Sequence, residues 1–407
     1  MSSRCVWAVG VAAFVCGGTA ASGQSTLTYQ QALTMARERA PRVAIARARI
    51  DEARGRIVGA RMRFRDNPVL DVSAGPRTLE SETVTDFELG INQIVELGNR
   101  RTARIDAAEA SVVREAATSD ATIRQLIRDV AVSFVRGQQA QARLDVLRAA
   151  ESVAKDALDA ADRRYRAGDV AVLDVNVARA SVARATAHVR VADADRAAAV
   201  GELKALLAWT EGADPAVEGD LRDRIRDGLA VQLLPANERP EVRMLLAEAA
   251  EAQADVRLGQ GLKKPDLGFG LRFEREEGHR AAAAGFSIGL PLFSKGQEQM
   301  ATGLARASRA ELERGVVVTE LELRARSAQT VFQMRLAAAE PLQRDVLPGL
   351  EENERLARRS FEVGELSLPD LLVIRREFVD TRLQLVDALA DAAIASIDLQ
   401  AAAGVLR

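Results

Sequence analysis

Residues 163–175 read RRYRAGDVAVLDV, and residues 359–371 read RSFEVGELSLPDL. Aligned without a gap, the two stretches share a glycine, the acid that follows it and an aspartate six residues after the glycine: Gly168, Asp169 and Asp174 in the first, and Gly364, Glu365 and Asp370 in the second. The glycines lie 196 residues apart in a chain of 407 residues. A match at about half the chain length indicates an internal duplication.

Other landmarks recur at nearly the same distance: Pro41 and Pro240, Pro68 and Pro265, and Gly98 and Gly296. Each half has the same order of helix, two short segments, very long helix, turn and helix. The sequence therefore predicts two structural repeats, residues 24–209 and 240–407. Residues 210–239, which are polar and contain glycine and proline, are predicted to be a linker or a small irregular appendage.

The N-terminus has one arginine, an apolar stretch and then small residues, which is typical of a secretory signal peptide over residues 1–23. Cys16 offers an alternative, a lipid anchor, although Val15 stands where a lipidation signal carries a small residue. Both cysteines of the chain, Cys5 and Cys16, fall in this segment. We therefore expect no disulfide and no cysteine metal ligand after cleavage.

Composition narrows the class of protein further. Aromatic residues make up only 4% of the chain while hydrophobic residues make up 48%, and small helix-forming residues suit closely packed long helices. The net charge of −2 gives no basic surface for nucleic acid. After the N-terminus no run of 18 apolar residues occurs, so no membrane-spanning helix is predicted.

Four short segments alternate between apolar and polar residues and are predicted to be strands: residues 68–76, 86–96, 265–274 and 282–293. Such strands are typical of transmembrane β-barrels. The alternative is a pair of amphipathic hairpins that lie on the helices. A membrane-spanning sheet must close, and closed barrels begin at about eight strands, so the first interpretation requires an oligomer.

Two very long helices are predicted, over residues 99–166 and 297–362. The first contains no proline across 68 residues and would extend roughly 100 Å at about 1.5 Å per residue. The second contains Pro341 and the sequence LPG at residues 347–349, where we expect a kink or a break.

The helices that follow the glycine turns each carry two apolar seams on opposite flanks. In the first helix they are Val175, Ala178, Val182, Ala185, Val189, Ala192, Ala199, Leu203 and Leu206, and Leu173, Val177, Ala180, Ala187, Val191, Ala194 and Ala198. Seams of the same kind occur after residue 373. A helix with a neighbour on each side belongs to a wall of helices or to the interior of an ordinary bundle. Together with secretion and the strands, the seams favour a tube.

No constellation of catalytic residues is present, and neither a P-loop nor a dinucleotide-binding fingerprint occurs. We therefore predict that the chain is not an enzyme and has no cofactor. His188 and His279 are far apart in sequence and lack metal-ligand spacing, so no metal site is predicted.

The chain resembles the TolC-type outer-membrane efflux channel family over nearly its whole length. The resemblance is carried by LTYQQALTMARERAPRVAIARARI (27–50), INQIVELGNRRTARIDAAEA (91–110), IGLPLFSKGQEQMATG (288–303) and the two glycine turns. It implies a mainly α-helical fold with a small transmembrane β part: a homotrimer with a twelve-stranded β-barrel and a long periplasmic α-helical barrel.

The resemblance also implies a location and partners. The channel would lie in the outer membrane of a Gram-negative bacterium, in contact with its lipid, and act with a periplasmic adaptor (membrane fusion protein) and an inner-membrane efflux pump. The segments after the hairpins look most like the branch that serves cobalt-zinc-cadmium pumps of the resistance-nodulation-division class. Export of organic compounds or drugs is the alternative cargo, and a secreted coiled-coil scaffold without a pore is the alternative class.

Two interpretations of the glycine turns remain open. Each glycine can end a helix in the left-handed conformation, and SLPD at residues 367–370 is typical of a helix N-cap, so Asp174 and Asp370 can be capping acids. The resemblance places both turns at the periplasmic tip, as a gate and an adaptor contact. The residues of this predicted site are Gly168, Asp169, Val170, Asp174, Gly364, Glu365, Leu366, Asp370, Arg375 and Arg376.

Overall fold

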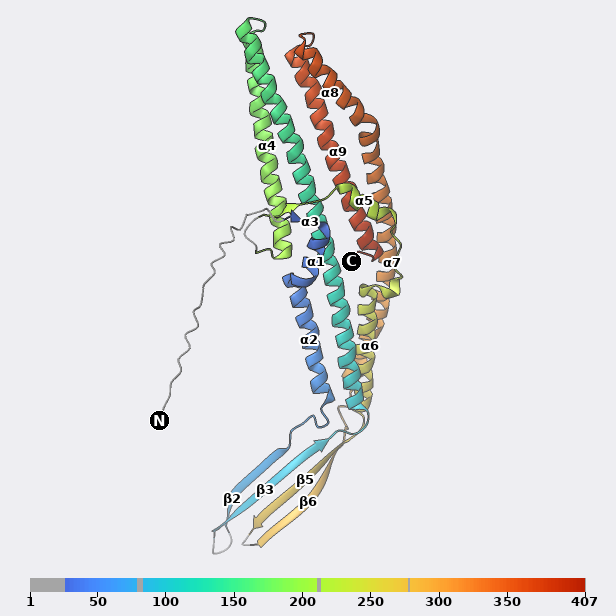
Figure 1. Cartoon of the computed structure of the whole chain (residues 1–407). Coiled ribbons are helices and arrows are strands. Elements are labelled where there is room, and N and C mark those ends of the chain that lie inside the picture. The colour runs from blue at the N-terminus through green and yellow to red at the C-terminus, as the bar shows by residue number, and fades with distance from the viewer. Residues whose placement is uncertain (1–25, 79–82, 211–213, 277–278, 407) are drawn as a thin grey trace, which may run out of the picture.

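The computed structural model describes residues 26–78, 83–210, 214–276 and 279–406. The predicted signal peptide, residues 1–23, lies outside these ranges. The chain is long and narrow, with a sheet at one end and two helical hairpin turns at the other (Figure 1). Among the described residues, no helix combines the length and apolar character needed to cross a membrane.

The elements follow one another as β1 (Thr26–Leu27), α1 (Tyr29–Arg39), α2 (Pro41–Arg61), β2 (Val69–Thr78), β3 (Thr83–Val95), α3 (Arg100–Ala167), α4 (Val172–Leu207), β4 (Ala216–Val217), α5 (Leu221–Leu229), η1 (Ala236–Glu238), α6 (Pro240–Gly261), β5 (Asp266–Glu276), β6 (His279–Gly289), α7 (Gln297–Pro341), η2 (Leu342–Val346), α8 (Leu347–Glu362) and α9 (Leu368–Ala403). Two short strands, β1 and β4, pair in parallel. The other four form one antiparallel sheet in the order β2-β3-β5-β6.

The four-stranded sheet has one apolar and one polar face. Its register aligns Leu70, Ile91, Leu271 and Ala284 in one row, and Asp71, Gly90, Arg272 and Ala283 in the next. The apolar face is exposed in the single chain; Leu70 and Leu271 are each 63% exposed. The last strand was predicted to reach residue 293 but ends at Gly289, because Pro291 has no backbone N–H to donate to a neighbouring strand.

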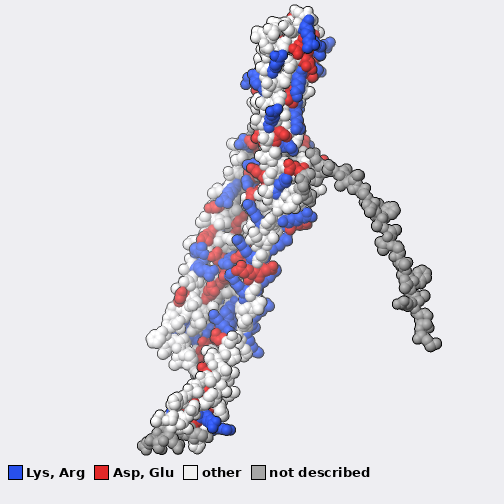
Figure 2. Space-filling model, turned by 90° about the vertical axis from the view of Figure 1, so that its left-hand side faces the viewer, with Lys and Arg blue, Asp and Glu red and all other residues white. Residues whose placement is uncertain are grey.

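The helices lie side by side in a curved wall (Figure 1). Next to the sheet the order of packing is α2, α3, α6 and α7, and towards the hairpin turns it is α4, α3, α9 and then α7 and α8. Figure 2 shows basic and acidic residues mixed along the helical part, whereas fewer charged residues are visible on the face of the sheet seen there. The edge elements of every layer therefore come from the same two parts of the chain: β2, α2 and α4 on one side, and β6, α7 and α8 on the other.

Prolines interrupt two helices, and the second interruption confirms the kink or break predicted at Pro341 and LPG. The opening helix divides at Pro41 into α1 and α2, because the residue before a proline is driven out of the helical region, and Ala40 has ψ 134°. The second long helix is not continuous over 297–362. It ends at Pro341 and passes through the π-helical turn η2 into α8, which begins just before Pro348.

The linker predicted over residues 210–239 contains more regular structure than expected. Its helix α5 begins at the cap of Asp220, whose side chain accepts a hydrogen bond from the N–H of Arg222, and buries Leu221 and Ile225. Gly228 lets the helix approach α9 closely, since an added Cβ would lie 2.5 Å from the Oγ of Ser396. We predicted a linker or a small irregular appendage because the nine residues of α5 are rich in Arg and Asp and bury only Leu221, Ile225 and Gly228, which gives a weak apolar pattern.

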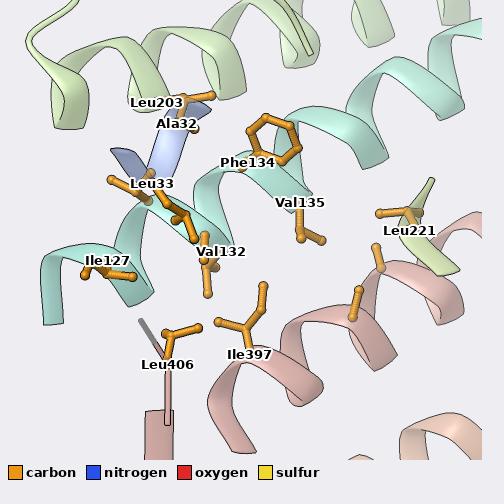
Figure 3. Packing of buried hydrophobic residues seen from close by; sticks show 14 of the residues in the cluster. Ala32, Leu33, Ile127, Val132, Phe134, Val135, Leu203, Leu221, Ile397 and Leu406 are labelled. Carbon is orange, nitrogen blue, oxygen red and sulfur yellow. The ribbon is translucent and has the colours of Figure 1, made fainter. Parts of the chain in front are cut away.

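The main core lies at the middle of the molecule, where α1, α3, α4, α5 and α9 converge (Figure 3). Phe134 is fully buried, and the ring of Tyr29 meets it edge-on at 5.5 Å between centroids. The guanidinium carbon of Arg224 lies over the ring of Tyr29, 4.1 Å from the ring centroid. This core joins α5 to helices of both repeats. It therefore holds in place the part of α3, α4 and α9 from which the helical hairpins extend.

The two returning helices differ in a way that their similar seams do not reveal. In α4, the seam that begins at Val175 faces α3, and Val175, Ala178 and Ala192 are buried. The second seam of α4 has no partner within the described chain: Leu173 is 67% exposed and Val191 is 62% exposed. In α9, by contrast, residues from both seams are buried: Ile397 of the seam that begins at Val379, and Leu385 of the seam that begins at Ile374. The reason is that α9 packs against both α3 and α7.

Candidate functional site

The two hairpin turns, far from the sheet, are joined by a small apolar cluster (Figure 1). All four helices contribute to it, with Ala157 and Ala161 from α3, Val175 and Ala178 from α4, Ala357 and Phe361 from α8, and Leu368 and Leu371 from α9. The guanidinium of Arg164 lies over the ring of Phe361 at 5.5 Å, which adds a contact between the repeats. The ten predicted site residues surround this cluster or continue along α9 from it.

The first turn has the conformation expected of a glycine-capped helix end. Gly168 has φ +84° and donates to the carbonyl of Tyr165 at 3.0 Å, while Asp169 donates to that of Arg164 at 2.9 Å. Val170 is half-buried and Asp169 is exposed. Asp174 lies in the first turn of α4, where a carboxylate favours the positive end of the helix, but no side chain caps this helix.

The second turn is tied more tightly. Gly364 has φ +83°, and the N–H groups of Glu365 and Leu366 both donate to the carbonyl of Ser360, at 2.9 and 3.2 Å. Ser367 is the N-cap of α9: its Oγ accepts from the N–H of Asp370 at 3.3 Å and lies 2.6 Å from Oδ2 of the same residue. The capping interpretation of SLPD is therefore confirmed, and Asp370 is engaged in the cap.

The two predicted arginines are not equivalent. Arg375 is largely buried, donates from Nη1 to the carbonyl of Val153 at 3.2 Å, and has Nε 3.7 Å from a carboxylate oxygen of Glu354. Burial lowers the pKa of the Arg375 guanidinium, and the Glu354 carboxylate opposes that shift. Arg376 is exposed and lies 3.5 Å from Asp380. Arg375 thus fastens α9 to α3 and α8, and the structure does not bring it to Asp370.

An open groove between α8 and α9 begins at the second turn. Its volume is about 470 Å³, and it is lined by Leu350, Asn353, Leu356, Ala357, Ser360, Leu366, Val373, Ile374 and Glu377. Leu366 is the only predicted site residue among them. No local pattern in the sequence indicates the groove or the roles of Arg164 and Glu354, because each depends on helices that are distant in sequence.

Chemically, the site consists of helix caps, ion pairs and an apolar groove. Among the described residues, no three side chains of His, Cys, Asp or Glu form a group that could hold a metal ion. His188 on α4 and His279 at the start of β6 are both exposed. The arrangement can position helix ends and present a surface to another protein.

A duplicated chain that joins a four-stranded amphipathic sheet to a wall of very long helices, closed at the far end by two capped hairpin turns, has the architecture of an outer-membrane channel subunit. The family model described as "Outer membrane efflux protein" matches residues 32–208 and 234–405. The chain belongs to this family. A curated relative, the cobalt-zinc-cadmium resistance protein CzcC of Cupriavidus metallidurans, is 27% identical over 367 residues, which cover 89% of this chain and 86% of the relative.

Solved structures have the same fold at low sequence identity. A structure of CusC superposes with a TM-score of 0.76 at 17% identity, covering 92% of this chain and 91% of that one. The CmeC outer membrane channel of Campylobacter jejuni gives a TM-score of 0.73 at 14% identity and covers 92% and 85% of the two chains. The open state of the Neisseria gonorrhoeae MtrE channel gives 0.71 at 17% identity, with 93% and 89% covered.

Proposed function

We propose that this protein is the outer-membrane channel of a tripartite efflux system, and that three copies close edge to edge around one axis. The proposal rests on the fact that the sheet and both levels of the helical wall end at two open edges, formed by the same parts of the chain. In the sheet, in the wall next to it and in the wall near the turns, four elements lie side by side, and both outer elements lack a neighbour on one side within the described chain.

Both edges expose apolar side chains. On one side these include Ile45 and Val58 of α2 and Val191 of α4, which are 56%, 67% and 62% exposed. On the other side α7 exposes Leu312, Val316 and Leu323 at 71%, 58% and 58%. Two different, complementary edges make a head-to-tail contact, and such a contact produces a ring when the rotation closes. The family resemblance supports three copies. Three copies of the four-stranded sheet give a barrel of twelve strands, and each copy contributes four helix positions to the wall at each height.

The sheet supports a membrane location for one end of this ring. Its apolar face would meet lipid and its polar face would line the lumen, as in transmembrane barrels. Lipid cannot satisfy the free backbone groups of β2 and β6, so these edges must pair, and the neighbouring copies supply the partner strands. The helical part then extends into the periplasm, and the hairpin turns lie at its far end.

The channel itself is a passive duct in this proposal, and a periplasmic adaptor and an inner-membrane pump supply selection and energy. The similarity to CzcC, a protein named for cobalt, zinc and cadmium resistance, favours heavy-metal cations as cargo. Organic compounds remain the second candidate cargo. A secreted scaffold without a pore is the alternative class, and it leaves the exposed apolar face of the sheet without a role.

Conductance in planar lipid bilayers tests the proposal directly. We expect the detergent-extracted protein to insert and form discrete ion-conducting channels, whereas a scaffold would be extracted without detergent and would not conduct. Deletion of the gene would then test the cargo. Reduced tolerance to cobalt, zinc or cadmium, with unchanged tolerance to organic dyes, would support heavy-metal cations as the cargo. Reduced tolerance to the dyes alone would support organic compounds instead.

The hairpin turns are proposed to form the gate and the adaptor contact. Replacing Arg375 by alanine removes its bond to Val153 and leaves Glu354 without its ion-pair partner. We expect α9 to loosen from α3 and the single-channel conductance to rise. Replacing Asp370 by alanine keeps the backbone N–H that donates to Ser367, and removes only the carboxylate that lies near the positive end of α9 and 2.6 Å from Ser367 Oγ, worth about 0.3–1 kcal/mol. It also removes any threefold ring of negative charge, so cation preference should fall with a smaller change in conductance.

Arg376 was predicted for the same site, but its side chain is exposed and its ion pair, with Asp380, lies within α9. Arg376→Ala is therefore the matched control and should leave the conductance close to that of the wild type. Wild-type conductance and ion preference in both the Arg375→Ala and Asp370→Ala channels would contradict a gate at these residues. Adaptor contact is tested separately by cysteine cross-linking at Val170 and Leu366, in cells that make the complete pump. Adducts at neither position would count against docking at the turns.

A further inference from the structure

The four described strands of the sheet carry four arginines, and two of them have no acidic partner among the residues that the structure describes. Arg77 pairs with Asp86 at 2.8 Å, and Arg272 pairs with Glu88 at 2.9 Å. Both lie on the polar face. Arg275 and Arg280 are exposed, and no hydrogen bond or ion pair connects either side chain to another described residue.

The two unpaired arginines face each other. In the register of β5 and β6, Arg275 lies directly opposite Arg280, in the row that also contains Phe87. Because side chains alternate along a strand, this row belongs to the apolar face, together with Leu271 and Phe273. Like charges directly opposite each other destabilise a strand pair, so the pair would gain from an anion bound between the two guanidinium groups.

The height of the pair on the apolar face coincides with a membrane boundary. Leu267 and Arg275 are eight residues apart on β5, which corresponds to about 26 Å along the strand at about 3.3 Å per residue, or roughly 19–22 Å of height at a strand tilt of about 35–45°. Transmembrane barrels expose an apolar band about 25 Å tall. Arg275 and Arg280 thus lie at the end of the apolar band, near the β5–β6 loop and away from the helices (Figure 1).

We propose that Arg275 and Arg280 bind the phosphate groups of lipid A, the membrane anchor of lipopolysaccharide, in the outer leaflet. This inference rests on the proposed function, which puts the loop end of the sheet at that leaflet. Guanidinium groups form paired, charge-assisted hydrogen bonds with phosphate oxygens, and two adjacent arginines suit a headgroup with two phosphates. The neighbouring Phe87 and Phe273 would contact the acyl chains.

Native mass spectrometry of the detergent-extracted full-length protein tests the site, with diphosphoryl lipid A as the probe. We expect the double variant Arg275→Gln/Arg280→Gln to bind this lipid roughly 10- to 30-fold more weakly than the wild type. Arg272→Gln is the matched control, because it removes the same charge from the polar face of the same strand and should leave affinity unchanged. The double variant Arg275→Lys/Arg280→Lys should retain part of the affinity for lipid A, because it keeps both positive charges.

Equal affinity of wild type and double variant, or an equal loss in Arg272→Gln, would overturn the proposal. Undiminished binding of a lipid A without phosphates would do the same, because it would indicate acyl-chain contact alone. Equal binding of phosphatidylglycerol or inorganic phosphate would show a general anion site and would overturn the assignment to lipid A. Channel conductance of the same preparation reports on the proposed function separately, so the two can fail independently.

Discussion

Replacing Gly296 by alanine is expected to destabilise the folded protein by roughly 2–5 kcal/mol, the largest effect we expect among the described glycines with positive φ. Gly296 begins α7 with φ +72°, and an added Cβ would lie 2.2 Å from the carbonyl oxygen of Gly259 on α6. An alanine in this conformation costs about 1–2 kcal/mol, and separating two packed helix backbones costs about 1–3 kcal/mol more. The free energy of unfolding in urea, measured in detergent, would report the loss.

The duplication supplies a control for this prediction. Gly98 is the counterpart of Gly296 in the first repeat and has φ +88°, but its nearest neighbour is the flexible side chain of Lys264, with Cδ 2.8 Å from an added Cβ. Gly98→Ala should therefore cost only about 1–2 kcal/mol, because the lysine can move aside. If both substitutions cost the same, the backbone contact between α6 and α7 does not matter as we describe.

Replacing Val191 by aspartate is expected to prevent trimer formation. Val191 lies on the seam of α4 that has no partner within the described chain and is 62% exposed. In the ring, each copy would bury this position against the next one, and burying a charge without a partner costs several kcal/mol at each of the three contacts. The fraction of trimer in detergent, measured by native mass spectrometry, should fall to near zero.

Ala197→Asp is the matched control on the same helix. Ala197 is exposed and lies on the side of α4 that carries Arg179 and Arg190, between the two seams. The same added charge should be solvated there and leave the trimer intact. Trimers of normal stability in Val191→Asp would mean that the second seam of α4 is not a contact between copies.

Helix caps could be predicted from the sequence, whereas the neighbours against which each helix packs could not. The caps at Gly168 and Gly364 follow from a few adjacent residues, and both glycines have positive φ. The seams of α4 and α9 are similar in sequence, yet only α9 is covered on both flanks. Which of two repeated helices lies at an edge depends on how the repeats pack, and periodicity within one helix carries no information on that.

The predicted site shows the same limit. The N-cap at Ser367, whose Oγ accepts a hydrogen bond from the N–H of Asp370, could be predicted from the four residues SLPD. Arg375 was predicted for the same site as Asp370, but its partners are Val153 and Glu354 on other helices. Helix α5 escaped prediction for a related reason, since its burial depends on the contact of Gly228 with α9.

The central claim is that this chain is one third of a closed channel. The mass of the wild-type assembly, measured by native mass spectrometry after extraction from the membrane in detergent, tests that claim most directly. We predict the mass of three chains, stable without any partner protein. A single chain, at the mass of one mature subunit under all detergent conditions, would contradict the account.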